Sequence, residues 1–210
     1  MNLSKSNHVN IIGDFAVGKT SIINSYKKLK FQETTIPTIG IENFLIHVNI
    51  DNKEIILNVY DTAGQEKYQA LTLNSIRHCE GLILVYDRSD YKTFENIYNV
   101  WIKSINEIIN LDITPCILVE NKCDLKLDSE IKEEKINEII NQFNLHFIKT
   151  SVIVNKNINE IFYNLAGMIY KKNHHIYIFD DYYIIEEDMY VFKIDKKIIK
   201  EKKIKKRNKC

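Results

Sequence analysis

The sequence predicts an α/β fold of three layers, with helices on both faces of a mostly parallel six-stranded sheet that has one antiparallel edge strand. Three observations lead to this prediction. Apolar, strand-like segments alternate with segments of helical periodicity in the second half of the chain, as in parallel β-α-β units. The segments 44–50 and 54–60 flank a turn and predict a hairpin. A glycine-containing loop, 13–21, connects the first strand to the first helix, as in folds that bind phosphate groups.

The other elements are expected in the following order. Strands are expected at 9–12, 82–86, 115–119 and 146–148. Two of them, 82–86 and 115–119, are almost entirely apolar, which is typical of strands that are buried on both faces. Helices are expected to begin at Ser21 and to span 93–109, 131–143 and 157–170. Apolar residues recur at helical spacing in the segment 93–109, and we expect Tyr98 and Trp101 to pack inside.

Length and composition fit one globular domain followed by a tail. The chain has 210 residues, 45% of them apolar, and a formal net charge of +1. We predict a domain over 1–172 and a tail over 173–210. The balanced charge gives no indication of a nucleic-acid partner. The sequence has no secretory signal or bilayer-spanning run, Asn2 excludes N-myristoylation, and the four cysteines lack metal-ligand spacing, so we expect a reduced, cytoplasmic protein.

The loop 13–21 has the complete pattern G-x-x-x-x-G-K-[ST] of a P-loop. Successive backbone N–H groups of such a loop point inward, and the dipole of the following helix favours negative charge. Lys19 is expected to reach the terminal phosphates, and the Thr20 hydroxyl to ligate Mg²⁺. The sequence therefore predicts a nucleotide site that includes Gly13, Asp14, Phe15, Ala16, Val17, Gly18, Lys19, Thr20 and Ser21.

A second group of residues, 61–66, follows the second strand of the hairpin. Asp61 comes after an apolar strand, where a carboxylate can help to hold Mg²⁺. Gly64 allows a backbone N–H to approach the terminal phosphate closely. Gln65 is placed to orient an attacking water molecule. We therefore expect metal ligation by Thr20 and Asp61 and a catalytic role for Gln65.

The base is expected to bind at two loops that follow later strands. Asn121, Lys122 and Asp124 come after the strand 115–119. A carboxylate such as that of Asp124 can accept hydrogen bonds from both N1–H and the 2-amino group of guanine, whereas adenine has no such pair of donors. After the strand 146–148, Ser151 and Val152 can offer a backbone N–H to the guanine O6. The sequence therefore predicts guanine selectivity.

In motif order and spacing the chain resembles small GTPases of the Ras superfamily over residues 8–171, and it is most similar to the Rab branch. The segments that carry this similarity are 38–42 (TIGIE), 60–68 (YDTAGQEKY) and 80–87 (EGLILVYD). The fold implied by the resemblance is that of the P-loop NTPases. The implied function is a GTP/GDP switch that depends on Mg²⁺ and acts in vesicle traffic, cycling to the cytosolic face of an internal membrane.

The resemblance also implies roles for particular residues. Thr38 would ligate Mg²⁺ only while the third phosphate is present, and hydrolysis would release both Thr38 and Gly64. Phe31 would stack on the base, with the aliphatic stem of Lys122 on its other face. An exchange factor, an activating protein and effectors would bind the switch segments 31–44 and 61–78.

One departure from the family pattern concerns hydrolysis. Phe15 stands where the family has a small residue, and its ring is expected to crowd Gln65 and any arginine from an activating protein. Such an arginine accelerates hydrolysis by roughly 10³–10⁵-fold, so we expect a slow GTPase. The alternative function is a GTP-binding scaffold or interaction module with little turnover. An unrelated P-loop kinase is disfavoured by the guanine-selective residues.

Two further departures concern the partner surface and the base. Asn43 stands where the Rab pattern has phenylalanine, and Phe44 follows it. A substitution is the favoured explanation, and a local bulge that returns Phe44 to that place is the alternative. Val152 and Ile153 replace the family's alanine and lysine. A backbone donor survives this change, so we expect guanine binding to persist with lower affinity.

The tail, 173–210, also differs from the family. Segments 176–179 and 190–192 have high β propensity, and the sequence is compatible both with a hairpin and with a disordered segment. From 193 to 210 there are nine Lys and one Arg against two acidic residues, a net charge of +8, which predicts binding to an anionic membrane surface. The chain ends on a single Cys210, for which prenylation and an unmodified basic tail are the alternatives.

Overall fold

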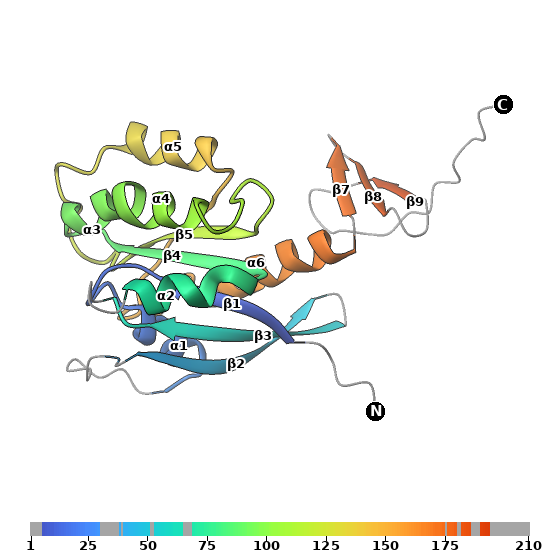
Figure 1. Ribbon diagram of the computed structural model, residues 1–210, viewed down its shortest axis with the longest axis horizontal. Helices are drawn as coiled ribbons and strands as arrows, with labels where there is room; N and C mark the ends of the chain where they lie inside the picture. Colours follow the sequence, from blue (N-terminus) through green and yellow to red (C-terminus); the bar gives the residue numbers. More distant parts are fainter. Residues whose placement is uncertain are drawn as a thin grey trace. The chain divides into compact units, whose positions relative to one another are not determined.

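The structure is a computed structural model, and Figure 1 shows its secondary structure. It describes the residues 6–29, 38, 40–50, 53–64, 69–174, 176–179, 182–185 and 190–193. The chain forms two compact units, Met1–Ala166 and Gly167–Cys210. The domain boundary predicted at 172/173 stays a prediction.

The first unit contains one six-stranded sheet with the strand order β2-β3-β1-β4-β5-β6. Only β2 is antiparallel to its neighbour; the other neighbouring strands pair in parallel. The predicted sheet, with its single antiparallel edge strand, is therefore confirmed. Its strands are β1 (Ser6–Ile12), β2 (Ile41–Ile50), β3 (Lys53–Thr62), β4 (Gly81–Asp87), β5 (Cys116–Asn121) and β6 (His146–Lys149).

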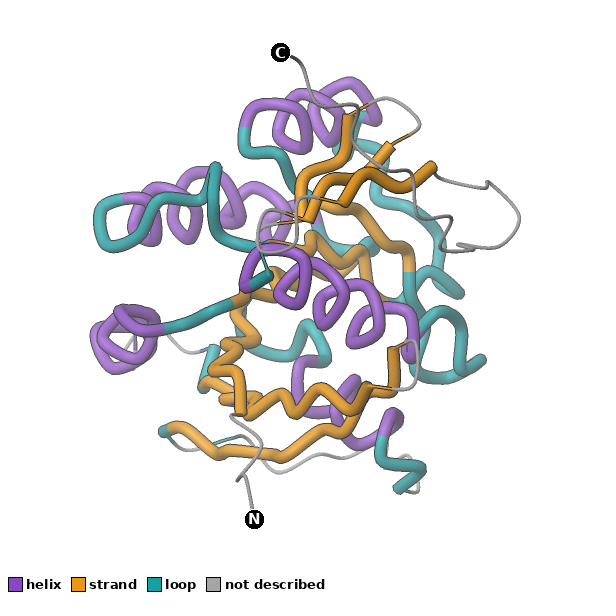
Figure 2. Tube along the Cα trace, turned by 90° about the vertical axis from the view of Figure 1, so that its right-hand side faces the viewer, coloured by secondary structure: helices purple, strands orange, loops and turns teal. Residues whose placement is uncertain are grey.

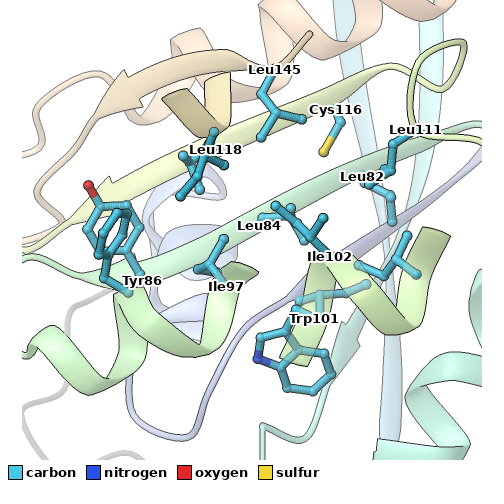
Figure 3. Packing of buried hydrophobic residues seen from close by; sticks show 14 of the residues in the cluster. Leu82, Leu84, Tyr86, Ile97, Trp101, Ile102, Leu111, Cys116, Leu118 and Leu145 are labelled. Carbon is cyan, nitrogen blue, oxygen red and sulfur yellow. The ribbon is translucent and has the colours of Figure 1, made fainter. Parts of the chain in front are cut away.

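Helices lie on both faces of this sheet (Figure 2). On one face α1 and α6 pack together, with the rings of Tyr26 and Phe162 4.6 Å apart. The opposite face carries a cluster of buried side chains from β4, β5 and the helices that cover them, among them Leu84, Trp101 and Leu118 (Figure 3). The helices are α1 (Lys19–Tyr26), α2 (Gln69–Ser75), η2 (Ile76–His78), α3 (Tyr91–Asn96), η3 (Ile97–Ile102), α4 (Lys103–Asn106), α5 (Glu133–Gln142) and α6 (Ile158–Asn173).

The helical segment predicted at 93–109 differs from its sequence-based description. It begins earlier, at Tyr91, because Asp90 caps it by accepting a hydrogen bond from the Lys92 N–H (3.0 Å). It ends at Asn106. Between these ends, η3 is a π-helix, a rare form with i→i+5 hydrogen bonds that often lies at functional sites. Helix α2 was not predicted.

Two strand ends also differ from the prediction, and both differences affect site residues. β3 continues to Thr62, so Asp61 lies inside the strand, opposite Glu42 of β2. β5 continues to Asn121, which pairs with Asp87 of β4. The strands are longer than expected because a neighbouring strand pairs with their polar ends, a contribution that apolar patterning does not detect.

The pairing of β2 with β3 decides between the two explanations for Asn43. The register is uninterrupted from Ile41 to Ile50, with Asn43 opposite Tyr60 and Phe44 opposite Val59. A bulge would place two residues opposite one, and none occurs here. Asn43 is therefore a substitution within a regular strand, as the favoured explanation predicted.

The second unit contains a three-stranded antiparallel sheet with the order β7-β8-β9. β7 (Ile176–Phe179) and β9 (Tyr190–Lys193) coincide with the two segments of high β propensity, and β8 (Tyr182–Ile185) lies between them. The hairpin alternative was therefore nearer to the structure, although it lacked the middle strand. Across the described parts of the chain, no helix combines the length and apolar character needed to cross a bilayer.

Candidate nucleotide-binding site

The P-loop connects β1 to α1 at the carboxyl edge of the parallel strands, where α/β sheets bind ligands. Gly18 has a φ of +99°, and a Cβ there would collide with the Asn121 amide nitrogen. Glycine is therefore required at this position both by backbone conformation and by space. Phe15 projects from the loop with 52% of its surface exposed.

Lys19 is buried inside the P-loop. Its ammonium group donates hydrogen bonds to the carbonyl oxygens of Gly13 (2.9 Å) and Asp14 (2.7 Å). Burial lowers the pKa of Lys19 to about 8, although the charges of Asp61 and Asp14 oppose this shift. The loop is therefore held closed around the ammonium group of Lys19.

A cluster of oxygen atoms forms where three separate segments meet. The Thr20 hydroxyl lies 2.5 Å from Asp61 Oδ2 and 3.0 Å from the Thr38 hydroxyl. Thr38 Oγ1 is also 3.4 Å from Asp61 Oδ2. The structure thus brings together the three residues predicted to ligate a metal.

The surroundings of Asp61 suit a cation. The residue is fully buried, and its Oδ1 has no hydrogen-bond partner among the described residues. Burial raises the pKa of Asp61, while the bond from Thr20 and the charge of Lys19 lower it. A cation beside Oδ1 would remove the cost of this buried, unpaired oxygen. Hydroxyl and carboxylate oxygens are the ligands Mg²⁺ prefers, and it is usually held by one or two carboxylates plus phosphates.

Gly64 contacts the P-loop from the start of the second switch segment. A Cβ at this position would collide with the carbonyl group of Asp14 and with the ammonium group of Lys19. Only glycine allows the backbone to approach this closely. Gln65, the predicted catalytic residue, lies outside the described residues.

Asn121 connects the P-loop to the loops on the base side. Its amide nitrogen donates to the Val17 carbonyl (2.8 Å), and its amide oxygen accepts from the Thr150 hydroxyl (3.1 Å). The side chain is buried, so these bonds hold three loops in a fixed relation. The structure therefore places Asn121 as a brace between the phosphate and base sides of the site.

Asp124 and Ser151 come together from the two loops predicted to bind the base. The Ser151 hydroxyl donates to Asp124 Oδ1 (2.5 Å), and the Cys123 N–H donates to the Thr150 carbonyl (2.8 Å). The Ser151 N–H donates to the Lys156 carbonyl (3.2 Å) within its own turn. One carboxylate oxygen of Asp124 is thereby fixed and the exposed end of the side chain is oriented.

Asp87 and Arg88, at and just beyond the end of β4, support the base-side loop, although the sequence assigned neither of them a role in the site. The Lys122 ammonium forms an ion pair with Asp87 Oδ2 (2.5 Å). The Arg88 guanidinium donates to the Cys123 carbonyl (2.8 Å) and lies 3.4 Å from the buried Glu120. The available sequence signal was position: Asp87 and Arg88 lie at or just beyond the carboxyl end of a buried strand.

Of the other predicted residues, Ser21 lies in the first turn of α1 and Val152 is half-buried in the turn after β6. Phe31, which was predicted to stack on the base, lies outside the described residues, as does Cys210.

A phosphate-binding loop that faces a buried carboxylate at the carboxyl edge of a parallel sheet defines the P-loop class of nucleotide-binding proteins. Comparison with known proteins narrows the class, because the model of the Ras family matches residues 8–171. The chain belongs to the Ras family of small GTPases, and it is Rab-like.

The curated relatives agree with this membership. The chain is 39% identical to the Ras-related protein Rab-13 of Bos taurus over 163 residues, which are 78% of this chain and 79% of that protein. It is 34% identical to the Ras-related protein SEC4 of Candida albicans, over 78% of this chain and 77% of that protein. It is 36% identical to Rab-8A of Bos taurus, over 77% of each chain.

Proposed function

We propose that this protein is a GTP/GDP switch that requires Mg²⁺, hydrolyses GTP and regulates vesicle traffic at the cytosolic face of an internal membrane. The observation that carries the proposal is the convergence of Thr20, Thr38 and Asp61 on one point beside the P-loop. The role in vesicle traffic follows from Rab-like membership and is an analogy with the family.

The oxygen cluster couples nucleotide state to the position of the first switch segment. Thr20 and Asp61 would hold Mg²⁺, which supplies positive charge to neutralise the phosphates. Thr38 comes from the segment 31–44. Its contact with the cluster is a hydrogen bond between its side-chain hydroxyl and that of Thr20. Thr38 would ligate Mg²⁺ only while the third phosphate is present. Loss of that phosphate would therefore release Thr38 and the segment 31–44.

The base side of the site favours guanine. Asp124 presents a carboxylate that can accept from N1–H and from the 2-amino group. Since the Ser151 N–H bonds to Lys156 within the turn, the Val152 N–H is the donor we assign to the guanine O6. Lys122, paired with Asp87, would cover one face of the base with its aliphatic stem. Phe31 is proposed for the other face on family resemblance.

The remaining parts of the proposal rest on the family. Gln65 would orient the attacking water molecule, and the switch segments 31–44 and 61–78 would bind the exchange factor, the activating protein and effectors. The basic tail would contact a membrane surface. No nucleic acid is proposed as a partner.

A binding and turnover experiment tests this function. The purified full chain should retain guanine nucleotide in preference to adenine nucleotide, and loaded GTP should convert to GDP and phosphate in a single turnover that stops when Mg²⁺ is removed. The variant Asp61→Asn should lose the Mg²⁺ dependence of nucleotide retention. Equal retention of ATP and GTP would contradict the proposal.

Phe15 favours a second candidate function, a GTP-bound scaffold with little turnover. Its ring is half-exposed at the P-loop and would occupy space that an activating arginine needs. We expect single-turnover hydrolysis to accelerate in the variant Phe15→Ser, most clearly when an activating protein is added, since such an arginine contributes roughly 10³–10⁵-fold. The matched control is Tyr163→Ser, which removes a ring of similar exposure (50%) on α6, outside the P-loop and both switch segments. If Phe15→Ser and the parent hydrolyse GTP at the same rate under both conditions, Phe15 does not limit turnover.

A further inference from the structure

The carboxylate of Asp14 in the P-loop is bound by two donors from the continuous helical segment α3–η3. Asp14 Oδ2 accepts a hydrogen bond from Asn96 Nδ2 (2.5 Å), and Oδ1 accepts one from the indole Nε1 of Trp101 (2.7 Å). Both oxygens therefore have donors, and bonds to a charged acceptor are about twice as strong as neutral ones. We call these three side chains the Asp14 clamp.

The π-helix η3 is what allows one helix to supply both donors. In an α-helix the residues that share a face are three or four apart, so Asn96 and Trp101, which are five apart, would point in different directions. In a π-helix the hydrogen bonds connect residues five apart. The segment Ile97–Ile102 has this form, and it brings both side chains to Asp14. The rare helix geometry thus has a direct consequence at the P-loop.

The clamp is anchored in the protein core. Trp101 is 3% exposed and belongs to the buried cluster beneath β4 and β5; Figure 3 shows its ring at the border of that cluster. A packed indole has little freedom to follow a moving loop. Asp14 is therefore held against a rigid part of the molecule.

The backbone carbonyl of Asp14 contacts both the Lys19 ammonium and the backbone at Gly64. Its carbonyl oxygen accepts a bond from the Lys19 ammonium (2.7 Å), and Gly64 lies so close that a Cβ would collide with that carbonyl. A displacement of Asp14 would move the lysine that faces the phosphates and would close the space that Gly64 needs. A released carboxylate would also repel the phosphates, since like charges a few ångström apart disfavour binding.

We propose that Asn96 and Trp101 are positioning residues for nucleotide binding, which hold the Asp14 carboxylate so that the P-loop retains guanine nucleotide. The inference rests on the proposed function, because it assumes that the loop binds GDP and GTP. It adds a regulatory route: a partner that moves α3 or η3 would loosen the nucleotide without touching it.

The test exchanges the donor and the acceptor between two positions. In Asn96→Asp, two carboxylates face each other, and GDP release should become about tenfold faster or more. In the double variant Asp14→Asn with Asn96→Asp, the amide at 14 donates to the carboxylate at 96 and still accepts from Trp101, so release should return to within about twofold of the parent. The single variant Asp14→Asn completes the cycle.

The measurement is dissociation of fluorescently labelled GDP with excess unlabelled GDP, at fixed Mg²⁺. Asn99→Asp is the matched control, since it makes the same chemical change at an exposed position of η3 and should leave the rate unchanged. Asn96→Ala, which removes one donor without adding charge, replaces Asn96→Asp if that variant does not fold. Trp101 is the single tryptophan of the chain, so its emission reports directly on the clamp, and it should shift in Asn96→Asp and return in the double variant.

The outcomes separate the inference from the proposed function. If the parent protein binds no guanine nucleotide, the proposed function itself is wrong. If the parent binds GDP but Asn96→Asp (or Asn96→Ala) releases it at the parental rate, the clamp does not position the loop. Fast release that the exchange of 14 and 96 does not correct would also overturn the inference, because it would show a general effect of charge at 96.

Discussion

At the scale of single residues, Lys19 links nucleotide binding to pH. Its pKa is lowered to about 8, chiefly by burial, so the free protein loses the Lys19 proton as the pH rises through about 8. Bound phosphates favour the charged form, and the complex therefore keeps this proton to higher pH. Above pH 8 binding takes up a proton, and affinity should fall with rising pH, by at most tenfold per pH unit.

Isothermal titration calorimetry with GDP and Mg²⁺ at pH 9 measures this proton uptake, as the difference in heat between buffers of different ionisation enthalpy. The same comparison at pH 7 should show much less uptake by Lys19, because the free protein already holds that proton. Identical uptake at the two values would contradict a pKa near 8 for Lys19.

A second prediction at this scale concerns the choice of base. In Asp124→Asn the side-chain oxygen keeps its bond from Ser151, while the other atom changes from an acceptor to a donor. The amide then faces the 2-amino group of guanine with a second donor, but it complements the 2-oxo group of xanthine. We expect GDP affinity to fall about 100-fold, since the unmade hydrogen bond involves a charged group.

Competition between the diphosphates of guanosine and xanthosine for Asp124→Asn decides this point. Xanthosine diphosphate should bind the variant more tightly than GDP, in the reverse of the order for the parent protein. A variant that loses both nucleotides equally would show that Asp124 serves the loop structure and does not read the base.

At the scale of elements, the ends of β4 and β5 are joined by a buried ion pair. Arg88 lies 3.4 Å from Glu120 Oε1, and the side chain of Glu120 is 1% exposed. The Tyr86 hydroxyl donates to Glu120 Oε2 (2.8 Å), and burial together with this carboxylate raises the pKa of Tyr86, so the phenol stays protonated. Because Arg88 also bonds the Cys123 carbonyl, the pair ties the base-side loop to the sheet.

Removing Arg88 leaves the buried Glu120 with a more distant cation, the Lys149 ammonium, which lies 4.0 Å from the same Oε1. We expect Arg88→Ala to lower the free energy of unfolding by about 1–3 kcal/mol, less than a wholly uncompensated buried charge would cost. The double variant Arg88→Ala with Glu120→Gln should lose clearly less, because no buried charge remains and the amide oxygen can still accept from Tyr86. Urea unfolding in saturating GDP measures both; equal losses in the two variants would show that packing of the Arg88 stem, and not charge, is what matters.

The same scale shows where sequence-based prediction succeeded and where it failed. The strands 82–86 and 115–119 were predictable because both faces are buried and nearly every residue is apolar. Helix α2 was not, since its seven residues are too few to establish a helical period. The π-helix left no local signal: Trp101 occupies a regular helical position in the apolar pattern, and its polar partner Asp14 lies 87 residues away in sequence.

At the scale of the whole molecule, the order of the strands in the sheet brings together site residues that the sequence motifs identify one by one. The motifs identified Lys19, Asp61 and Asp124, and the strand order brings the carboxyl ends of β1, β3 and β5, near which these residues lie, to one edge of the sheet. The sequence identified Asn121 as a site residue. It could not show that the Asn121 amide bonds to the Val17 carbonyl, because only the fold brings these two distant residues together. The supporting contacts of Asp87, Arg88 and Asn96 belong to tertiary structure and were not accessible from patterns.

The last prediction concerns the tail and its partner surface. Residues 193–210 carry a net charge of +8, and each cation near an anionic bilayer contributes about 1 kcal/mol. The unlipidated full chain should therefore sediment with vesicles that contain phosphatidylserine and stay in solution with vesicles of phosphatidylcholine alone. A chain that ends at residue 193 should lose this binding, while its GDP affinity should not change, because the site residues all lie before residue 153.

Salt and charge variants separate electrostatic attraction from apolar insertion. Raising ionic strength from 0.1 M to 1 M shortens the Debye length from about 10 Å to about 3 Å, and it should release a protein that is held by charge alone. Replacing Lys202, Lys203, Lys205 and Lys206 by Glu should have the same effect at low salt. If the full chain stays on the vesicles at high salt, membrane binding instead depends on apolar residues, and the strands β7–β9 become the segments to mutate next.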